Sequence, residues 1–274
     1  MKKSLSAVAF AVVAATSLVA SAGRGGSAAK IDAAISSRSP DAIIAELERA
    51  EHLVCGACVD SVHALLDHDD YTVRQAAAWW FAKRPAVKEK LIDMMISDLQ
   101  SGDARSVRNA ADFVGTVKAH RSLAALTTAY GRGLDVTART QIARALGYLG
   151  RTANTALTQV LADSDAGVRA EAVDAWYRVS YQRGAAPVVA VLTDSDAKVR
   201  AKAAAVVGGM HEATGRAALE QLVVSDADAE VRRNAAWALG QLGDPASRTA
   251  LQQASTDRSG LVRRVASAAL ASLR

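Results

Sequence analysis

Aromatic residues are scarce in this sequence, since Phe, Trp and Tyr together make up 4% of its 274 residues, and there are only four prolines. β-Sandwiches and β-barrels depend on aromatic and β-branched residues and on many turns, so the composition argues against an all-β protein. Half of the residues are nevertheless apolar and 22% are charged. That balance is not typical of a disordered chain, which combines low hydrophobicity with high net charge.

Alanine supplies much of the apolar half, with 61 residues. Alanine loses no side-chain entropy in a helix and has the highest helix propensity. A chain that combines so much alanine with leucine and valine at spaced positions is therefore predicted to be helical.

The first 22 residues resemble a secretory signal peptide. Lys2 and Lys3 precede an apolar stretch from Leu5 to Ala20, and Ala20-Ser21-Ala22 fits the small residues that signal peptidase requires. A transmembrane anchor is the alternative, but the apolar stretch is short for a span. We expect cleavage near Ala22, a flexible start over residues 23–29, and a periplasmic or secreted bacterial protein with no membrane span in its mature chain.

Charge gives no indication of nucleic-acid binding. Loss of Lys2 and Lys3 lowers the formal net charge from +5 to +3, and the basic residues are spread along the chain. A nucleic-acid-binding surface requires a concentrated basic patch. We therefore expect no nucleic acid among the partners.

A motif of the form Asp-x-x-Val-Arg recurs every 30 to 33 residues. Internal repeats of this length are typical of stacked helical units. The valine position of each copy, including the divergent ones, falls at Val73, Ser106, Ala138, Val168, Val199, Val231 and Val262.

The positions after each valine repeat as well. Small or apolar residues stand four, five and eight positions later, so they share one face of a helix with the valine. The ninth position is glycine or alanine in every copy except one, where it is Tyr177. We expect these glycines to end the helices in a left-handed conformation.

The acidic and basic positions of the motif have a structural explanation. An Asp just before a helix caps its free N–H groups, and an Arg one turn later can pair with that Asp or with the Asp of the next repeat. We therefore predict a structural ladder between repeats rather than a catalytic site. Its predicted members are Asp70, Arg74, Asp135, Arg139, Asp165, Arg169, Asp196, Arg200, Asp228 and Arg232.

The segment DAEVRRNAAWALG, residues 228–240, resembles HEAT repeats, and most closely the short HEAT-like repeat named after phycobilisome lyases. The resemblance is strong over 69–274 and weak over 30–68. It implies an all-α protein, an α-solenoid of about eight helical hairpins of the HEAT-like or armadillo type. Such arrays mostly bind other proteins along a groove.

The N-terminal segment 30–68 is predicted to be an irregular helical cap with a Cys-x-x-Cys sequence. Cys55 lies between two expected helices, at 41–50 and 57–66, and Cys58 lies near the start of the second. In an exported protein two cysteines are expected to form a disulfide. A redox-active pair, or a metal site of His52, Cys55, Cys58 and His63, is the alternative.

The few aromatic residues are candidates for partner contacts because the repeat does not require them. The predicted contact residues are Trp79, Trp80, Trp176, Tyr177 and Trp237, with a role in capping the hydrophobic core as the alternative.

The sequence therefore predicts a scaffold that binds another extracytoplasmic protein, without catalysis or cofactor. A redox- or metal-handling accessory protein is the main alternative, and a bilin-lyase-like activity is a minor one. Di-iron hydroxylases with HEAT-like repeats use several His-Glu pairs, whereas this sequence has only His211-Glu212.

Overall fold

The computed structural model describes residues 26–179 and 184–273, so the expected signal peptide lies outside the described residues. The described residues form sixteen α-helices, short 3-10 turns and no β-strand. The prediction of an all-α protein is therefore confirmed. None of the described helices is both long and apolar enough to cross a membrane.

The chain divides into two compact units, Met1–Lys88 and Glu89–Arg274. The first unit contains α1 Ala28–Ser37, α2 Pro40–Arg49, α3 Cys58–Ala64 and α4 Tyr71–Ala82. Helix α4 carries the first copy of the repeat motif. Its packing against α2 shows that even-numbered helices already pack on one another in this unit.

The second unit begins within α5 Pro85–Ser101 and consists of six further hairpins. The remaining helices are α6 Ala104–Thr116, α7 Leu123–Tyr130, α8 Val136–Tyr148, α9 Asn154–Val160, α10 Ala166–Arg178, α11 Ala186–Val189, α12 Ala197–Gly209, α13 Arg216–Ser225, α14 Ala229–Leu242, α15 Arg248–Ala254 and α16 Gly260–Ser272. Together with the first unit, the described helices make eight consecutive pairs, in line with the predicted α-solenoid.

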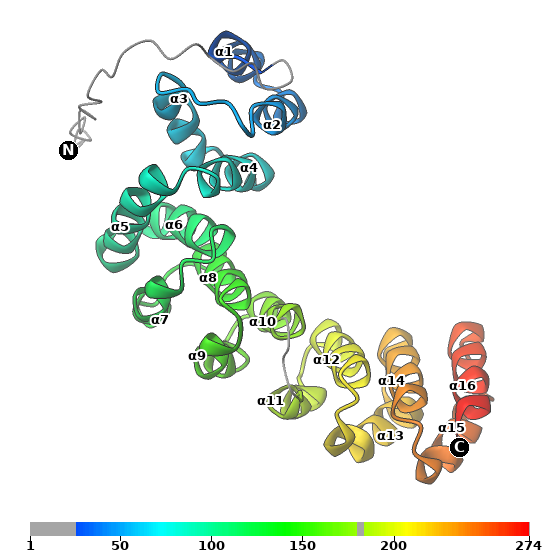
Figure 1. The fold of residues 1–274 in the computed structure, drawn as a ribbon. Coiled ribbons are helices and arrows are strands. Elements are labelled where there is room, and N and C mark those ends of the chain that lie inside the picture. Colours follow the sequence, from blue (N-terminus) through cyan, green and yellow to red (C-terminus); the bar gives the residue numbers. More distant parts are fainter. Residues whose placement is uncertain (1–25, 180–183, 274) are drawn as a thin grey trace. The chain divides into compact units, whose positions relative to one another are not determined.

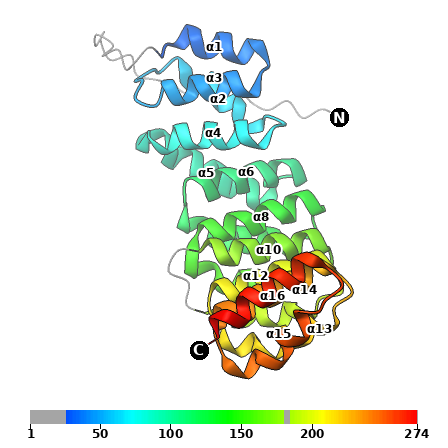
Figure 2. The ribbon, with the colours of Figure 1, turned by 90° about the vertical axis from the view of Figure 1, so that its right-hand side faces the viewer.

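Within the second unit the even-numbered helices form one continuous layer. Each packs on the next from α6 to α16, and the odd-numbered helices from α7 to α15, which are shorter, lie in a second layer beside them (Figures 1 and 2). The even-numbered helices carry the repeat motif. Side chains at corresponding motif positions therefore recur side by side along this layer.

The core follows the repeat register. Ala203, Ala204 and Val207 of α12, four, five and eight positions after Val199, are fully buried. The corresponding residues of the other helices are buried too, except that Ser267 is exposed and Leu270 partly exposed in α16. The expected core face is therefore confirmed.

The glycines at the ninth position do not end the helices, and that expectation was wrong. Gly115, Gly147, Gly208 and Gly240 lie inside α6, α8, α12 and α14. A Cβ atom added to any of them would lie only 2.5 to 3.1 Å from the Cα atom of an alanine in the next helix. They are small because neighbouring helices approach closely there. Left-handed residues come three positions later, at Lys118, Gly150, His211 and Gly243.

We predict that Gly208→Ala destabilises the second unit by about 1–3 kcal/mol, because the new methyl group would meet the Ala238 backbone at 2.5 Å. Urea denaturation at equilibrium measures the change. Gly260→Ala is the matched control, since the nearest atom there is a flexible Arg263 side-chain atom at 3.5 Å. An unchanged or raised stability for Gly208→Ala would contradict the close-approach explanation, because alanine is otherwise the better helix former.

The aspartates that begin the motif cap their helices. Each is extended, and its carboxylate accepts backbone N–H groups two or three residues on; Asp228, for example, accepts those of Glu230 and Val231 at 2.7 and 3.2 Å. The same arrangement is found at Asp70, Asp103, Asp135, Asp165 and Asp196.

The motif arginines connect two loops. The Nη1 group of Arg200 donates to the carbonyls of Asp194 and Ser195, in the loop before its own helix, at 2.8 and 3.1 Å. Its Nε and Nη2 groups donate to the carboxylate of Asp226 in the following repeat, at 2.7 and 3.0 Å. A planar guanidinium suits this bidentate geometry.

The acidic partner in this ladder is not the capping Asp, which corrects the prediction. In four successive repeats the motif arginine binds the Asp that lies two residues before the next cap. The four pairs are Arg139–Asp163, Arg169–Asp194, Arg200–Asp226 and Arg232–Asp257, with Nε to Oδ2 distances of 2.9, 2.6, 2.7 and 2.7 Å. The capping Asp residues at 165, 196 and 228 bind backbone N–H groups instead.

The Asp226 carboxylate is kept ionised by its partners. Burial acts to raise its pKa, but hydrogen bonds from the Arg200 side chain and the Asp228 backbone N–H outweigh burial, so the pKa lies below its usual value. A carboxyl group whose pKa is lowered by folding stabilises the fold above its unfolded pKa of about 3.9. That stabilisation is lost as the pH falls through the folded pKa.

We predict that Asp226→Asn destabilises the second unit by about 2–4 kcal/mol at pH 7, because it leaves the Arg200 guanidinium without its carboxylate. The difference from the unmodified protein should shrink below about pH 4. Asp228→Asn is the matched control, since Asn caps helices as well as Asp does. Denaturant titrations at pH 7 and pH 3 check both; equal losses for the two variants would contradict the corrected pairing.

Candidate functional site

The structure buries two of the five aromatic residues predicted to contact a partner. Trp80 is fully buried and donates its Nε1 proton to the Ala50 carbonyl at 3.2 Å, and Trp176 is buried and donates to the Gly184 carbonyl at 3.3 Å. These two residues belong to the core, so the prediction that they contact a partner was wrong. Trp79 is partly exposed, with the Lys83 ammonium 5.2 Å from its ring centroid.

Tyr177 and Trp237 are exposed, by 58% and 39%. Tyr177 lies on α10 and Trp237 on α14, on the two helices that flank α12 in the motif-bearing layer. Large exposed aromatic side chains are rare in this protein and are enriched at the centre of protein interfaces.

Two glycines at the end of α12 separate these aromatic residues. A Cβ atom built on Gly209 would lie 3.2 Å from Cε2 of Tyr177, and one built on Gly208 would lie 3.1 Å from Cζ3 of Trp237. Both rings therefore lie against backbone that carries no side chain. We call Tyr177, Gly208, Gly209 and Trp237 the α12 aromatic site.

Charged side chains on the same layer are largely neutralised by one another. Glu171 of α10 accepts hydrogen bonds from Arg144 of α8 at 3.0 and 2.9 Å and from Arg178 at 3.1 Å. Burial acts to raise the pKa of Glu171, but the two arginines hold it below its usual value. Asp174 pairs with Lys202 of α12. The exposed rings are therefore the main apolar feature of this surface.

His211 and Glu212, the single His-Glu pair, have local structural contacts. The Nδ1 atom of His211 lies 2.9 Å from the Gln241 carbonyl oxygen. Glu212 accepts hydrogen bonds from the Thr214 hydroxyl at 2.6 Å and from the Ala185 N–H at 2.7 Å, and these lower its pKa. Both side chains thus position loops next to α12.

In the first unit the two cysteines form a disulfide, Cys55–Cys58, with 5.3 Å between their Cα atoms. It lies in the loop between α2 and α3. Cys58 is buried, whereas Cys55 is partly exposed and the adjacent Val54 is 95% exposed.

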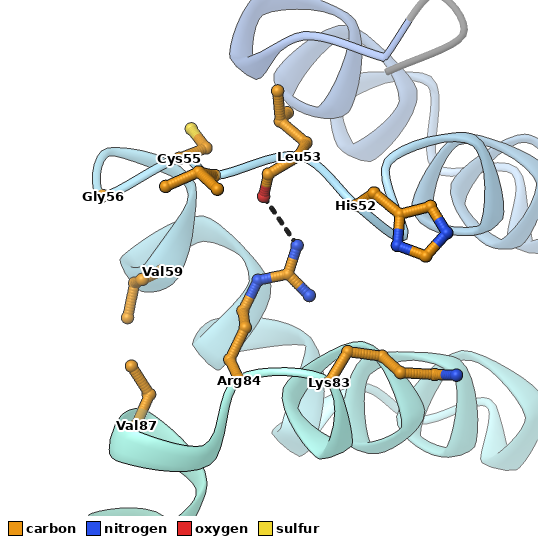
Figure 3. A pocket seen from close by; sticks show the side chains of 9 residues that line it. His52, Leu53, Cys55, Gly56, Val59, Lys83, Arg84 and Val87 are labelled. Atoms are coloured by element: carbon orange, nitrogen blue, oxygen red, sulfur yellow. Dashed lines mark hydrogen bonds between the residues drawn. The ribbon is translucent and has the colours of Figure 1, made fainter. Parts of the chain in front are cut away.

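Arg84 holds this loop in place (Figure 3). Its Nη2 group donates to the carbonyls of Leu53, Ala50 and Glu51 at 2.7, 3.2 and 3.3 Å. Its guanidinium carbon lies 3.2 Å from the centroid of the Trp80 ring. Burial lowers the pKa of Arg84 to about 10, so it remains a cation at neutral pH.

A pocket of about 270 Å³ lies between this loop and the start of α5. Leu53, Val54, Val59 and Val87 give it apolar walls, and Val59 and Val87 lie opposite one another in Figure 3. The remaining lining residues are His52, Cys55, Gly56, Lys83 and Arg84.

The metal-site alternative finds no ligand set in the described part of the chain. Both sulfur atoms of the predicted set are joined in the disulfide. The described residues contain no group of three or more His, Cys, Asp or Glu side chains that could hold a metal ion, and His52 is largely exposed.

Comparison with known families identifies the repeats. Residues 185–271, from just before α11 to the end of α16, match the family model for HEAT repeats. The helical pairs within residues 185–271 therefore match HEAT repeats. The α12 aromatic site lies within the matched segment except for Tyr177, which lies eight residues before its start. No curated protein sequence matches the chain.

Several solved structures are similar to this chain at low sequence identity. Escherichia coli YibA is 14% identical, with a TM-score of 0.58, 89% of this chain and 91% of YibA being covered. The CpcE–CpcF complex of phycocyanin lyase from Nostoc sp. PCC7120 is 20% identical, with a TM-score of 0.41 and coverage of 79% and 94%. Human deoxyhypusine hydroxylase is 18% identical, with a TM-score of 0.40 and coverage of 90% and 96%. The similarity to YibA shows the shared fold.

We predict that Arg84→Met destabilises the first unit by about 2 kcal/mol, because three loop carbonyls lose a charged donor while the aliphatic packing is kept. Amide hydrogen exchange over residues 51–57 should become faster, with no change in the second unit. Lys83→Met is the control and should cost less than about 1 kcal/mol, since it removes the partly exposed ion pair with Glu51 and the ammonium contact with the Trp79 ring, but no donor to the loop carbonyls. Unchanged exchange in Arg84→Met would contradict the assigned role.

Proposed function

We propose that this chain is a non-catalytic HEAT-repeat scaffold that acts outside the cytoplasm and binds another protein at the α12 aromatic site. The exposure of Tyr177 and Trp237 beside the bare backbone of Gly208 and Gly209 carries this proposal. The Cys55–Cys58 disulfide and the signal-peptide-like residues 1–22 support an oxidising, extracytoplasmic location.

The geometry favours an extended segment of the partner that carries an aliphatic or proline side chain. Such a side chain can pack on the exposed parts of the two rings, while the segment's backbone passes beside Gly209, the one of the two glycines that is partly exposed. A partner that covers the exposed parts of these side chains, 58% of Tyr177 and 39% of Trp237, removes apolar aromatic surface from water within a small contact area. The paired charges of Glu171 and Asp174 surround the site without demanding a strongly charged partner.

The test is affinity capture from an extracytoplasmic extract, followed by titration of the captured partner. We predict that the Tyr177→Ala/Trp237→Ala double variant weakens binding at least 10-fold, because truncation of a central aromatic contact costs about 1–2 kcal/mol or more. Gly209→Leu should weaken binding as well, because even its Cβ atom would lie 3.2 Å from the Tyr177 ring, so the larger side chain displaces that ring.

Leu261→Ala is the matched control, because it removes another exposed apolar side chain of the same unit, 46% exposed on α16. It should bind like the unmodified protein. If the double variant retains full affinity for every captured partner, or if Leu261→Ala loses affinity equally, the α12 aromatic site is not the contact surface.

A further inference from the structure

The loop that carries the disulfide is held in place by other contacts. Arg84 binds three carbonyls of residues 50–53, Trp80 donates to Ala50, and Lys83 pairs with Glu51 at 2.7 Å. The Cys55–Cys58 bridge closes only a short ring within the loop itself. A ring this small removes little entropy from the unfolded chain, so the bridge adds little stability. It can therefore open without loss of the surrounding structure.

The two sulfur atoms differ in access. Cys58 is 2% exposed, whereas Cys55 is partly exposed and lines the pocket. Thiol–disulfide exchange requires an incoming thiolate to reach one sulfur of the bridge, and access decides which one. The burial difference makes Cys55 the sulfur that is attacked and Cys58 the leaving group.

The surroundings of Cys55 favour a thiolate there after reduction. The backbone N–H of Cys58 lies 3.1 Å from the Cys55 Sγ atom and donates to it. Two basic residues, Lys83 and Arg84, line the same pocket. Hydrogen bonds and nearby positive charge stabilise a thiolate relative to a thiol.

The pocket beside Cys55 suits an apolar segment of polypeptide. Its volume of about 270 Å³ and its valine and leucine walls can take one or two aliphatic side chains. Val54 next to it is exposed and has no core role. An accessible disulfide with apolar walls beside it has the features of a site for a cysteine-containing peptide.

We propose that the Cys55–Cys58 disulfide is an exchange site for cysteines of a bound polypeptide whose aliphatic side chains occupy the pocket. This activity goes beyond the scaffold function and lies in the other unit from the α12 aromatic site. The peptide thiolate attacks Cys55 Sγ, the Cys55–Cys58 bond breaks, and its electron pair leaves on Cys58 Sγ, which takes a proton from water. The product is a mixed disulfide between the peptide and Cys55.

A peptide with a second cysteine completes the exchange. Its second thiolate attacks the peptide sulfur of the mixed disulfide, and the electron pair returns to Cys55 Sγ. The peptide leaves as a disulfide and the chain keeps two thiols, so two electrons pass from the peptide dithiol to the chain. The chain disulfide is the oxidant and the peptide dithiol the reductant.

The test compares three thiols against the full-length oxidised protein: a peptide with one cysteine flanked by leucines, the same peptide with flanking aspartates, and glutathione. Quenched mass spectrometry measures formation of the mixed disulfide. We expect the leucine peptide to react at least 10-fold faster than the aspartate peptide, with the adduct mapped to Cys55. In the Cys58→Ser variant Cys55 is a free thiol. When this variant is mixed with the disulfide-linked dimer of the leucine peptide, the adduct on Cys55 should accumulate.

Val87→Asp should abolish the faster reaction of the leucine peptide, because it places a charge in the apolar wall of the pocket. The rate with glutathione should stay within about twofold, because the Cys55–Cys58 disulfide itself is unchanged. Ala86→Asp, at the exposed neighbouring position, is the matched control and should keep the faster reaction of the leucine peptide. Equal rates for the two peptides, an adduct on Cys58, or a bridge that reacts only in denaturant would overturn the proposal. None of these results bears on the α12 aromatic site.

Discussion

The repeat array depends on one interaction, the set of hydrogen bonds that the guanidinium of a motif arginine donates to two successive loops. Each of these arginines binds the carbonyls of the loop before its own helix and the aspartate of the following loop, as Arg200 does with Asp194 and Asp226. The carboxylate of that aspartate also accepts the N–H of the next capping residue. One guanidinium thus fixes where two successive helices begin. With both starts fixed, the glycine at position nine can lie directly against the alanine of the next helix.

The candidate binding site arises where the array departs from its own pattern. Tyr177 replaces the small residue at the ninth position, and Trp237 occupies a position that small or polar residues hold in most other repeats. Because the ladder fixes α10, α12 and α14 in register, both departures fall beside the same two glycines. In the first unit Arg84 plays a comparable part, since it anchors the disulfide loop through three carbonyls. Arginines that order loops therefore underlie both candidate sites.

Much of the fold could be predicted from the sequence, because the period, the buried positions and the capping aspartates all follow from local helix chemistry. The partner of the arginine could not be identified by the same reasoning, although the Asp-x-Asp spacing of Asp163 with Asp165 and of Asp226 with Asp228 was a visible signal. Helix geometry alone does not decide which of two aspartates faces the preceding repeat. Likewise, the burial of Trp80 and Trp176 depends on neighbouring helices and loops that a single helix pattern does not specify.

A double-mutant cycle between neighbouring repeats tests the ladder most directly. The free energies of unfolding of Arg200→Ala, Asp226→Asn and the double variant, measured at pH 7, give the coupling between the two side chains. The account predicts a coupling of about 1.5–3 kcal/mol for Arg200 with Asp226, and less than about 0.5 kcal/mol for Arg200 with Asp228. A coupling below about 0.5 kcal/mol for the first pair, or an equal coupling for the second, would contradict it.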